Sequence, residues 1–326
     1  MPALRAADLG RGKRCRFASF LGCPVAIAIV GLKNSFQSVD FDREDVMRIL
    51  LGVCFTLYLL IAGTAQADVL ARLSQGEPLR LGFREDAAPF SYLNDLGTPV
   101  GFSIELCGVV VADLKRELDL PDMLVEFVAV GAEDRFAALQ DGAIDLMCGA
   151  TTATLSRRQK VDFSIPTFID GASVLYRKDG PADFESLSGQ RVGVRGGTTT
   201  EEALRKALSD LSVDAEVVSV DDHNAGLEML ETGELAAYFA DQGILLFLLL
   251  HSEAKDQLWL SGRFFTREPY ALALPRGDSD FRLFVDSSLS RLYRDGRIGA
   301  LFTKSFGIAK PSQLVEALYL INALPE

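Results

Sequence analysis

From residue 79 onward, short apolar runs alternate with longer stretches whose apolar residues recur every three or four positions. The short runs are typical of buried strands, and the longer spacing is typical of helices that pack on one face. Regular alternation predicts an α/β fold, because each helix carries the chain back to the start of a neighbouring strand. The first set predicts strands at 79–83, 124–130 and 144–148, and helices at 102–118 and 133–140.

A second set of elements repeats this order. It predicts strands at 191–195, 216–220 and 235–240, and helices at 199–208, 224–231 and 243–250. A further strand at 270–274 and two helices, at 280–293 and 297–306, precede a tail.

Two similar sets with a late return of the chain predict two lobes joined by a hinge of at least two crossing segments. We expect these segments near residues 174–178 and 270–275. Lobe 1 would then contain residues 79–175 and 275–326, and lobe 2 would contain residues 176–274.

The charge balance excludes one large class of partner. The chain has 33 Lys and Arg against 45 Asp and Glu, a net charge of −12. A nucleic-acid partner is not expected, because phosphate binding requires a basic face. The same acidic excess repels anions at long range, so any anion site must be a local cluster of Arg and backbone N–H groups.

The N-terminal region contains a pattern typical of export. Met47 and Arg48 precede an apolar run at 49–62, and Ala65-Gln66-Ala67 then offers the small residues that a signal peptidase cuts. We expect a signal peptide at 47–67 and a mature periplasmic protein that begins at Asp68. The alternative is a buried helix or an uncleaved anchor.

Residues 1–46 contain a second basic and then apolar stretch. The preferred interpretation is an upstream start assigned in error, with Met47 as the initiator, and the alternative is an additional membrane anchor.

Two cysteines, Cys107 and Cys148, remain after residue 67. An even number in an oxidising compartment permits one disulfide, but two buried thiols are the preferred interpretation. With two His residues in the chain, these cysteines show no metal-ligand spacing, so no metal is expected.

Polar residues or glycines follow most of the predicted strands, where ligands bind in open α/β sheets. Such positions are often polar without a function, so the combination carries the prediction. The residues are Arg84, Thr151, Thr152, Gly196, Gly197, Thr198, Thr199, His223 and Asp241.

Two of these places have a chemistry suited to anions. The segment 196–201 joins a strand to a helix, so free N–H groups at the helix start can hold an anion. It lacks the Gly-Lys-Ser/Thr of a nucleotide-phosphate loop, and no cofactor is expected. Arg157 follows Thr152 closely, and its planar guanidinium can clamp a carboxylate beside that hydroxyl, although a lone Arg is more often a surface charge.

Several ordered motifs resemble one known family. They are Arg84-Glu85-Asp86-Ala87-Ala88-Pro89-Phe90-Ser91-Tyr92, the segment 100–106, the segment 145–152 with Arg157, and Gly197-Thr198-Thr199. Together, from about residue 79 to the C-terminus, they resemble the amino-acid-binding proteins of bacterial ABC importers (extracellular solute-binding proteins, family 3), and within them the glutamate/aspartate binders. The resemblance implies the two-lobed periplasmic-binding-protein (Venus-flytrap) fold with a central ligand cleft.

The resemblance also implies a ligand site. Arg157 and Thr152 would hold the α-carboxylate of an amino acid, and Asp241 would pair with its α-ammonium. The side-chain carboxylate of an acidic ligand would be held by the remaining residues, which are Arg84, Arg135, His223, Thr198 and Thr199. The chain departs from the acidic binders at Ala132 and Ala150, where serine is expected.

The expected function is therefore binding of an amino acid and its delivery to a permease in the inner membrane, by a monomer without catalysis. One alternative is an enzyme similar to cyclohexadienyl or arogenate dehydratase on the same fold, with Glu85 or Asp86 as the acid. Another is the ligand-sensing ectodomain of a receptor.

Overall fold

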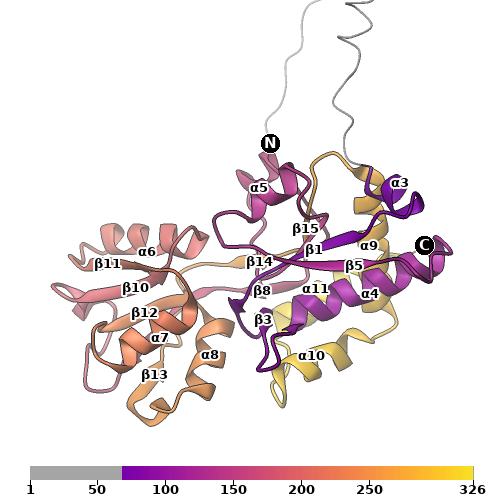
Figure 1. Cartoon of the computed structure of the whole chain (residues 1–326). Helices are drawn as coiled ribbons and strands as arrows, with labels where there is room; N and C mark the ends of the chain where they lie inside the picture. The colour runs from indigo at the N-terminus through magenta and orange to yellow at the C-terminus, as the bar shows by residue number, and fades with distance from the viewer. Residues whose placement is uncertain (1–67, 326) are drawn as a thin grey trace, which may run out of the picture. The chain divides into compact units, whose positions relative to one another are not determined.

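The computed structural model of the protein describes residues 68–325 (Figure 1). The predicted signal peptide, its cleavage site and the segment before it lie outside the described residues. Within this range, no helix has the length and apolar character needed to cross a membrane.

The first of two five-stranded sheets has the order β5-β1-β6-β15-β7. Strand β1 (Leu79–Phe83) pairs in parallel with β5 (Val125–Ala129) and β6 (Leu146–Cys148), as the alternation with helices predicts. Strand β15 (Ala273–Leu274) returns from late in the chain and pairs antiparallel with β6 and with β7 (Asp162–Phe163). We call this sheet and its helices lobe 1.

The helices of lobe 1 come from both ends of the described chain. Helix α4 packs against α9 and α10, and α11 packs against α9, so the C-terminal segments cover the sheet together with α4. The bounds are α3 (Val69–Ser74), α4 (Phe102–Glu117), α5 (Arg135–Gln140), α9 (Ser279–Arg294), α10 (Ile298–Phe306) and α11 (Gln313–Asn322). A small antiparallel sheet of β2 (Asp86–Ala87), β3 (Ser91–Leu93) and β4 (Pro99–Val100) follows β1.

The sequence analysis left the last of these helices as a tail. Helix α11 begins at an N-cap, Ser312, whose hydroxyl accepts from the Val315 N–H, and it buries Val315, Leu318 and Tyr319. These three positions lie on one face at helical spacing, so the signal for this helix was present but short.

The second sheet has the order β11-β10-β12-β9-β13, and with its helices we call it lobe 2. Strand β10 (Arg191–Arg195) lies in parallel between β11 (Glu216–Val220) and β12 (Ala237–Asp241). Strand β9 (Ala172–Arg177) is antiparallel to β12 and to β13 (Leu258–Leu260). The helices are α6 (Thr199–Asp210), α7 (His223–Glu231) and α8 (Gln242–His251).

Strands β8 (Phe168–Asp170) and β14 (Glu268–Tyr270) carry the chain between the lobes and pair with each other antiparallel. This ribbon confirms the predicted two-lobed fold with a hinge of two crossing segments (Figure 1). The two crossings between the lobes lie a few residues before residues 175 and 275. Strand β9 already pairs along its whole length within lobe 2, and β15 already pairs within lobe 1.

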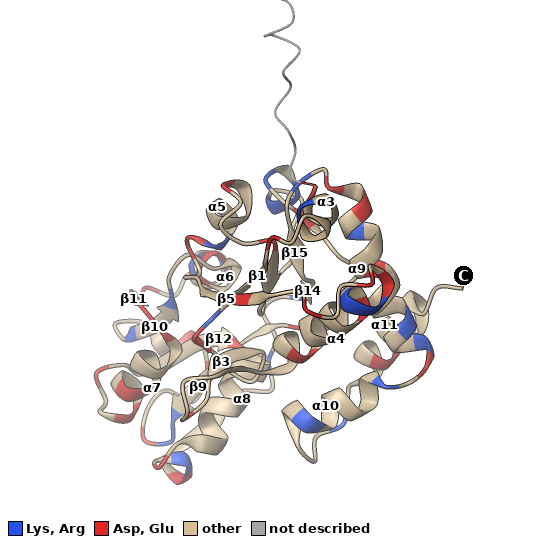
Figure 2. Cartoon of the chain, turned by 45° about the vertical axis from the view of Figure 1, so that its right-hand side comes forward, with Lys and Arg blue, Asp and Glu red and all other residues tan. Residues whose placement is uncertain are grey.

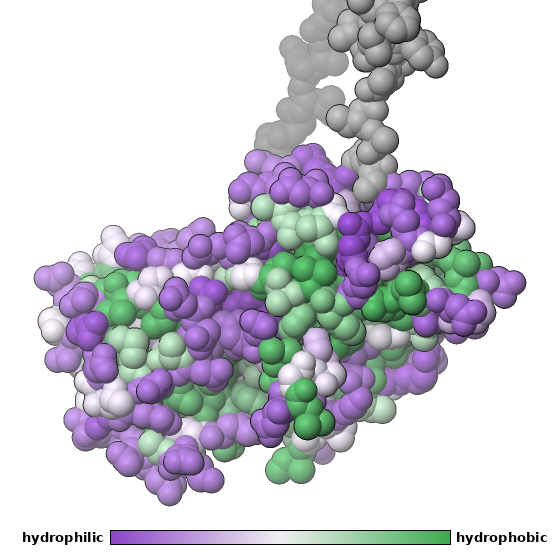
Figure 3. All heavy atoms as spheres, viewed as in Figure 1, coloured by the Kyte–Doolittle hydropathy of each residue, from purple (hydrophilic) through white to green (hydrophobic). Residues whose placement is uncertain are grey.

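The surface is mixed in both charge and hydropathy. Figure 2 marks acidic and basic residues along the backbone of both lobes, with many of them on the helices. On the face seen in Figure 3, hydrophilic residues dominate the outer parts and hydrophobic residues gather toward the middle.

A disulfide joins Cys107 on α4 to Cys148 at the end of β6, with the two Cα atoms 6.2 Å apart. The preferred interpretation of two free thiols was therefore wrong. Both residues are fully buried, and α4 packs directly on β6. A separation of 41 residues concealed this contact in the sequence.

We expect the double substitution Cys107→Ala with Cys148→Ala to destabilise the protein. Opening a covalent loop of 41 residues frees unfolded-chain entropy worth about 4 kcal/mol in the chain-entropy model. Urea unfolding of both proteins with and without dithiothreitol measures this loss. With dithiothreitol, the free energy of unfolding of wild type should fall toward that of the variant. A variant as stable as oxidised wild type would contradict the expectation.

Candidate functional site

The carboxyl ends of parallel strands from both lobes meet at one buried cavity. All eight predicted site residues line it, namely Arg84, Arg135, Thr152, Arg157, Thr198, Thr199, His223 and Asp241. Ala150 and Arg195 also line it. The lobes approach closely here, since the hydroxyl oxygens of Thr152 and Thr199 are 3.4 Å apart. The free space is about 30 Å³, room for about two water molecules.

The turn between β10 and α6 presents several side chains of lobe 2 to the cavity. Strand β10 ends at Arg195, and Gly197 then adopts a φ of +68°, which favours glycine. A Cβ on Gly197 would also lie 2.4 Å from Cγ of Glu133 in lobe 1. Thr198 caps α6, because its hydroxyl accepts from the Glu201 N–H at 3.1 Å and donates to the Arg195 carbonyl at 2.8 Å.

One end of the cavity is lined by the carboxylate of Asp241, and two further carboxylates, of Glu268 and Asp170, lie near it outside the lining. Asp241, the last residue of β12, accepts from the Thr200 hydroxyl at 2.9 Å and from the Tyr270 hydroxyl. Burial, together with the negative charge of Glu268, raises the pKa of Asp241 to about 6. Glu268 in turn accepts from the Thr199 hydroxyl at 3.0 Å. This end therefore suits a cation that can stabilise closely placed carboxylates.

Asp170 extends this acidic group into the hinge ribbon, where it lies opposite Glu268 in register. Its carboxylate accepts from the backbone N–H groups of Gly171 at 2.8 Å and Gly243 at 3.0 Å. Burial, and next the charge of Asp241, nevertheless raises the pKa of Asp170 to about 8.

The other end is rich in guanidinium groups. Arg135 is 2% exposed, donates to the Ala132 carbonyl, and lies with its guanidinium 4.8 Å from the centre of the Phe136 ring. Within residues 68–325 its Nε has no hydrogen-bond partner. Burial, and next the charges of Arg157 and Arg84, lowers the pKa of Arg135 well below its usual range. A buried cation with an unused donor is costly unless an anion reaches it.

Arg157 lies between these two ends. Its Nη1 donates to the Thr152 carbonyl at 2.9 Å, and its guanidinium lies 5.1 Å from the centre of the same Phe136 ring. Burial lowers the pKa of Arg157, while the negative charges of Glu268, Glu202 and Asp241 oppose that effect. The backbone contact and the ring together fix the guanidinium at the cavity wall.

His223 is the first residue of α7, after the N-cap Asp222, and it is buried. Its Nδ1 lies 2.9 Å from the Tyr238 hydroxyl. Burial is the main cause that lowers the pKa of His223 to about 4, and the positive charges of Arg84 and Arg195 add to it. The imidazole is therefore neutral at pH 7 and offers a hydrogen bond rather than a charge.

Comparison with known proteins identifies the family of this chain. Residues 79–308 match the family of bacterial extracellular solute-binding proteins, family 3. The chain belongs to this family. An L-glutamate/L-aspartate-binding protein of Pseudomonas aeruginosa is 31% identical over 262 residues, which is 79% of this chain and 87% of that protein. A glutamate/aspartate import solute-binding protein of Escherichia coli is 28% identical over 76% of this chain and 85% of its own length.

Among solved structures, an ancestral amino-acid-binding protein that is a precursor of cyclohexadienyl dehydratase is 27% identical to this solute-binding protein. The two structures superpose with a TM-score of 0.63, and the match covers 73% of this chain and 99% of that protein.

The sequence analysis missed three charged residues of the site. Arg195 was assigned to the end of a strand, and Glu268 and Asp170 lie in hinge strands that no periodicity marked. This chain has alanine at positions 132 and 150, where the resemblance to acidic binders led us to expect serine. Here Ala150 lines the cavity, and Ala132 contributes its carbonyl to Arg135. Within the described range, no three His, Cys, Asp or Glu side chains are grouped to hold a metal ion.

The raised pKa of Asp170 predicts a pH dependence of folding stability. A carboxyl that ionises at a higher pH in the folded state stabilises the protein most below its unfolded pKa of about 4, and that contribution is lost as pH rises to about 8. We expect Asp170→Asn to remove part of the decline in stability between these pH values. Urea unfolding at a series of pH values measures the difference from wild type.

The exposed Asp122→Asn is the matched control and should leave the profile unchanged. Parallel profiles for wild type and Asp170→Asn would contradict the prediction.

Proposed function

We propose that this protein binds an acidic amino acid, glutamate or aspartate, in the periplasm and delivers it to an ABC permease in the inner membrane, as a monomer and without chemical turnover. The observation that carries the proposal is the division of one buried cavity into a carboxylate end and a guanidinium end. An amino acid with an acidic side chain carries one ammonium and two carboxylates, so its charges complement a cavity with a carboxylate at one end and guanidiniums in the middle and at the other end.

The proposed contacts follow this division. The α-ammonium pairs with Asp241, and the α-carboxylate lies against Arg157 and Thr152. The side-chain carboxylate lies against Arg84, Arg135 and His223, with Thr198 and Thr199 beside it. The buried Nε of Arg135 supports this assignment, because a carboxylate oxygen would satisfy it. The relatives that bind glutamate and aspartate support the same ligand class.

The mechanism is closure about the β8–β14 ribbon. The cavity has little free space and is lined from both lobes, so an amino acid enters only when the lobes separate. Affinity comes from contacts that are better in the closed state, and closure is the signal that a permease can recognise. Residues of both lobes should therefore contribute to binding.

The dehydratase alternative requires an acid that holds a proton near neutral pH. Glu85 is exposed, and Asp86 is bonded to two guanidiniums. Burial opposes ionisation of Asp86, but the positive charges led by Arg84 lower its pKa overall. Neither residue suits the role.

We expect no turnover of prephenate or arogenate, and product detection by chromatography measures this. Turnover that disappears in Asp86→Asn would overturn the expectation.

Selectivity tests the proposed contacts. Arg157→Ala leaves the α-carboxylate without its partner, which costs roughly 2 to 5 kcal/mol, about 30-fold to several thousandfold in Kd, for every amino acid that binds. Arg84→Ala should instead weaken glutamate and aspartate while sparing or improving glutamine and asparagine, because removing a cation relieves the mismatch with a neutral amide. Calorimetry with the four amino acids measures both effects.

If wild type prefers a neutral or basic amino acid, or if Arg84→Ala weakens glutamate and glutamine equally, the acidic-ligand assignment fails. The binding-protein assignment would survive that result.

A further inference from the structure

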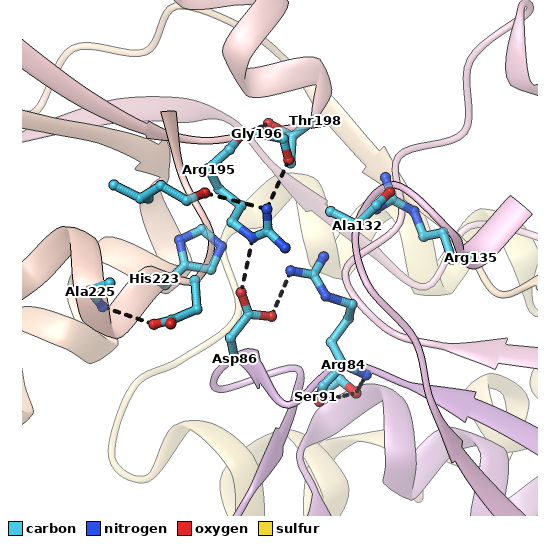
Figure 4. Close-up of polar contacts among 12 residues, drawn as sticks. Arg84, Asp86, Ser91, Ala132, Arg135, Arg195, Gly196, Thr198, His223 and Ala225 are labelled. Atoms are coloured by element: carbon cyan, nitrogen blue, oxygen red, sulfur yellow. Dashed lines mark hydrogen bonds and ion pairs between the residues drawn. The ribbon is translucent and has the colours of Figure 1, made fainter. Parts of the chain in front are cut away.

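One carboxylate in the cleft is shared between arginines of opposite lobes. Asp86 lies on β2 in lobe 1, and Arg195 ends β10 in lobe 2. Asp86 Oδ2 accepts from Arg195 Nε at 3.2 Å, and its Oδ1 accepts from Arg84 Nη2 at 2.5 Å. Figure 4 shows Asp86 between the two guanidiniums. The bond from Asp86 to Arg195 therefore crosses the cleft.

All three side chains are largely removed from water. Their exposed fractions are 5% for Arg84, 10% for Asp86 and 12% for Arg195. Burying an ion pair costs desolvation energy, which the pair recovers only with good geometry and further hydrogen bonds. Such a pair is thus sensitive to the relative position of the groups that form it.

Each lobe holds its own member of the pair in place. The Nη1 of Arg195 donates to the carbonyls of Gly196 and Val220, both at 3.3 Å, so lobe 2 presents its Nε toward the cleft. In lobe 1, Arg84 holds Asp86, and the Arg84 N–H donates to the Ser91 hydroxyl at 2.9 Å. Each member of the pair is thus fixed by contacts within its own lobe.

We propose that the Asp86–Arg195 ion pair forms when the lobes close, stabilises the closed state, and positions Arg84 for the ligand. This inference rests on the proposed function only in taking closure to accompany binding. Asp86 also separates Arg84 from Arg195, two cations that would otherwise repel each other across the cleft. Asp86 and Arg195 are thus positioning residues, which act on the ligand through closure and through Arg84.

The test is a double-mutant cycle of Arg195→Ala and Asp86→Ala, with Kd measured for glutamate and for glutamine. Arg195→Ala alone should weaken binding by about tenfold or more, within the range expected of coupled neighbours. In the Asp86→Ala background, Arg195→Ala should raise Kd by a factor at least about ten times smaller, because Arg195 then has no partner in Asp86 and only repels Arg84. Additive effects would overturn the proposal.

Binding kinetics separate this role from a merely structural one. A bond made after the ligand has docked should slow dissociation, so Arg195→Ala should raise koff with kon little changed, as stopped-flow fluorescence or surface plasmon resonance would measure. Arg195→Lys keeps the charge and should restore part of the effect. A fall in kon with koff unchanged would instead indicate steering of the ligand and would overturn the proposal.

Arg205→Ala is the matched control. Arg205 is an exposed arginine of α6 that pairs with Glu201 within lobe 2 at 2.9 Å, so its loss should leave Kd and koff unchanged. The part of the coupling that arises from closure does not depend on the ligand's charge, so it is measured with either amino acid. If glutamine binds and glutamate does not, the acidic-ligand assignment fails while the ion pair is still tested.

Small-angle scattering measures closure directly, with glutamate or glutamine, whichever binds, at the concentration that half-saturates wild type. Arg195→Ala and Asp86→Ala should each have a larger radius of gyration than wild type and Arg205→Ala. Equal radii for all four proteins would contradict the claim that the pair stabilises closure.

Discussion

The cost of burying charge governs how the cleft of this protein is built. Four guanidiniums line one cavity, from Arg84, Arg135, Arg157 and Arg195. A charged group taken out of water is unfavourable by several kcal/mol unless it is paired and hydrogen-bonded. Backbone carbonyls and Asp86 accept from these arginines, but among the residues that the structure describes none accepts from Nε of Arg135. The site therefore favours the arrival of an anion, although the chain as a whole is acidic.

Burial of charge is also unfavourable at the carboxylate end, where the buried charges are negative. This end adjoins the hinge ribbon. Asp170 and Glu268 face each other across the β8–β14 ribbon, and Tyr270 of the same ribbon donates to Asp241. Residues at a hinge move least when lobes rotate. In the proposed closure, the group that suits an ammonium thus keeps its geometry, whereas the guanidinium end is divided between the two lobes.

Most of the fold could be predicted from the sequence where periodicity was clear. Strands β1, β10 and β11 have the predicted bounds, because each is a short apolar run between polar residues. The antiparallel strands β9 and β13 and the hinge strands were not resolved by the pattern, since an apolar run does not state its partner or direction. The disulfide was missed for a related reason, as only packing of α4 on β6 brings its cysteines together.

Part of the candidate site could be predicted from the sequence, and part could not. The eight predicted residues came from positions after strands and from motifs shared with a family, and the fold brings them to one cavity. Arg195 has neither signal, because it is the last residue of a strand, and its partner Asp86 was considered only as an acid. Motifs carry what relatives share, whereas a bond between residues 109 positions apart depends on how two lobes meet. A bond of this kind is therefore not revealed by the sequence taken alone.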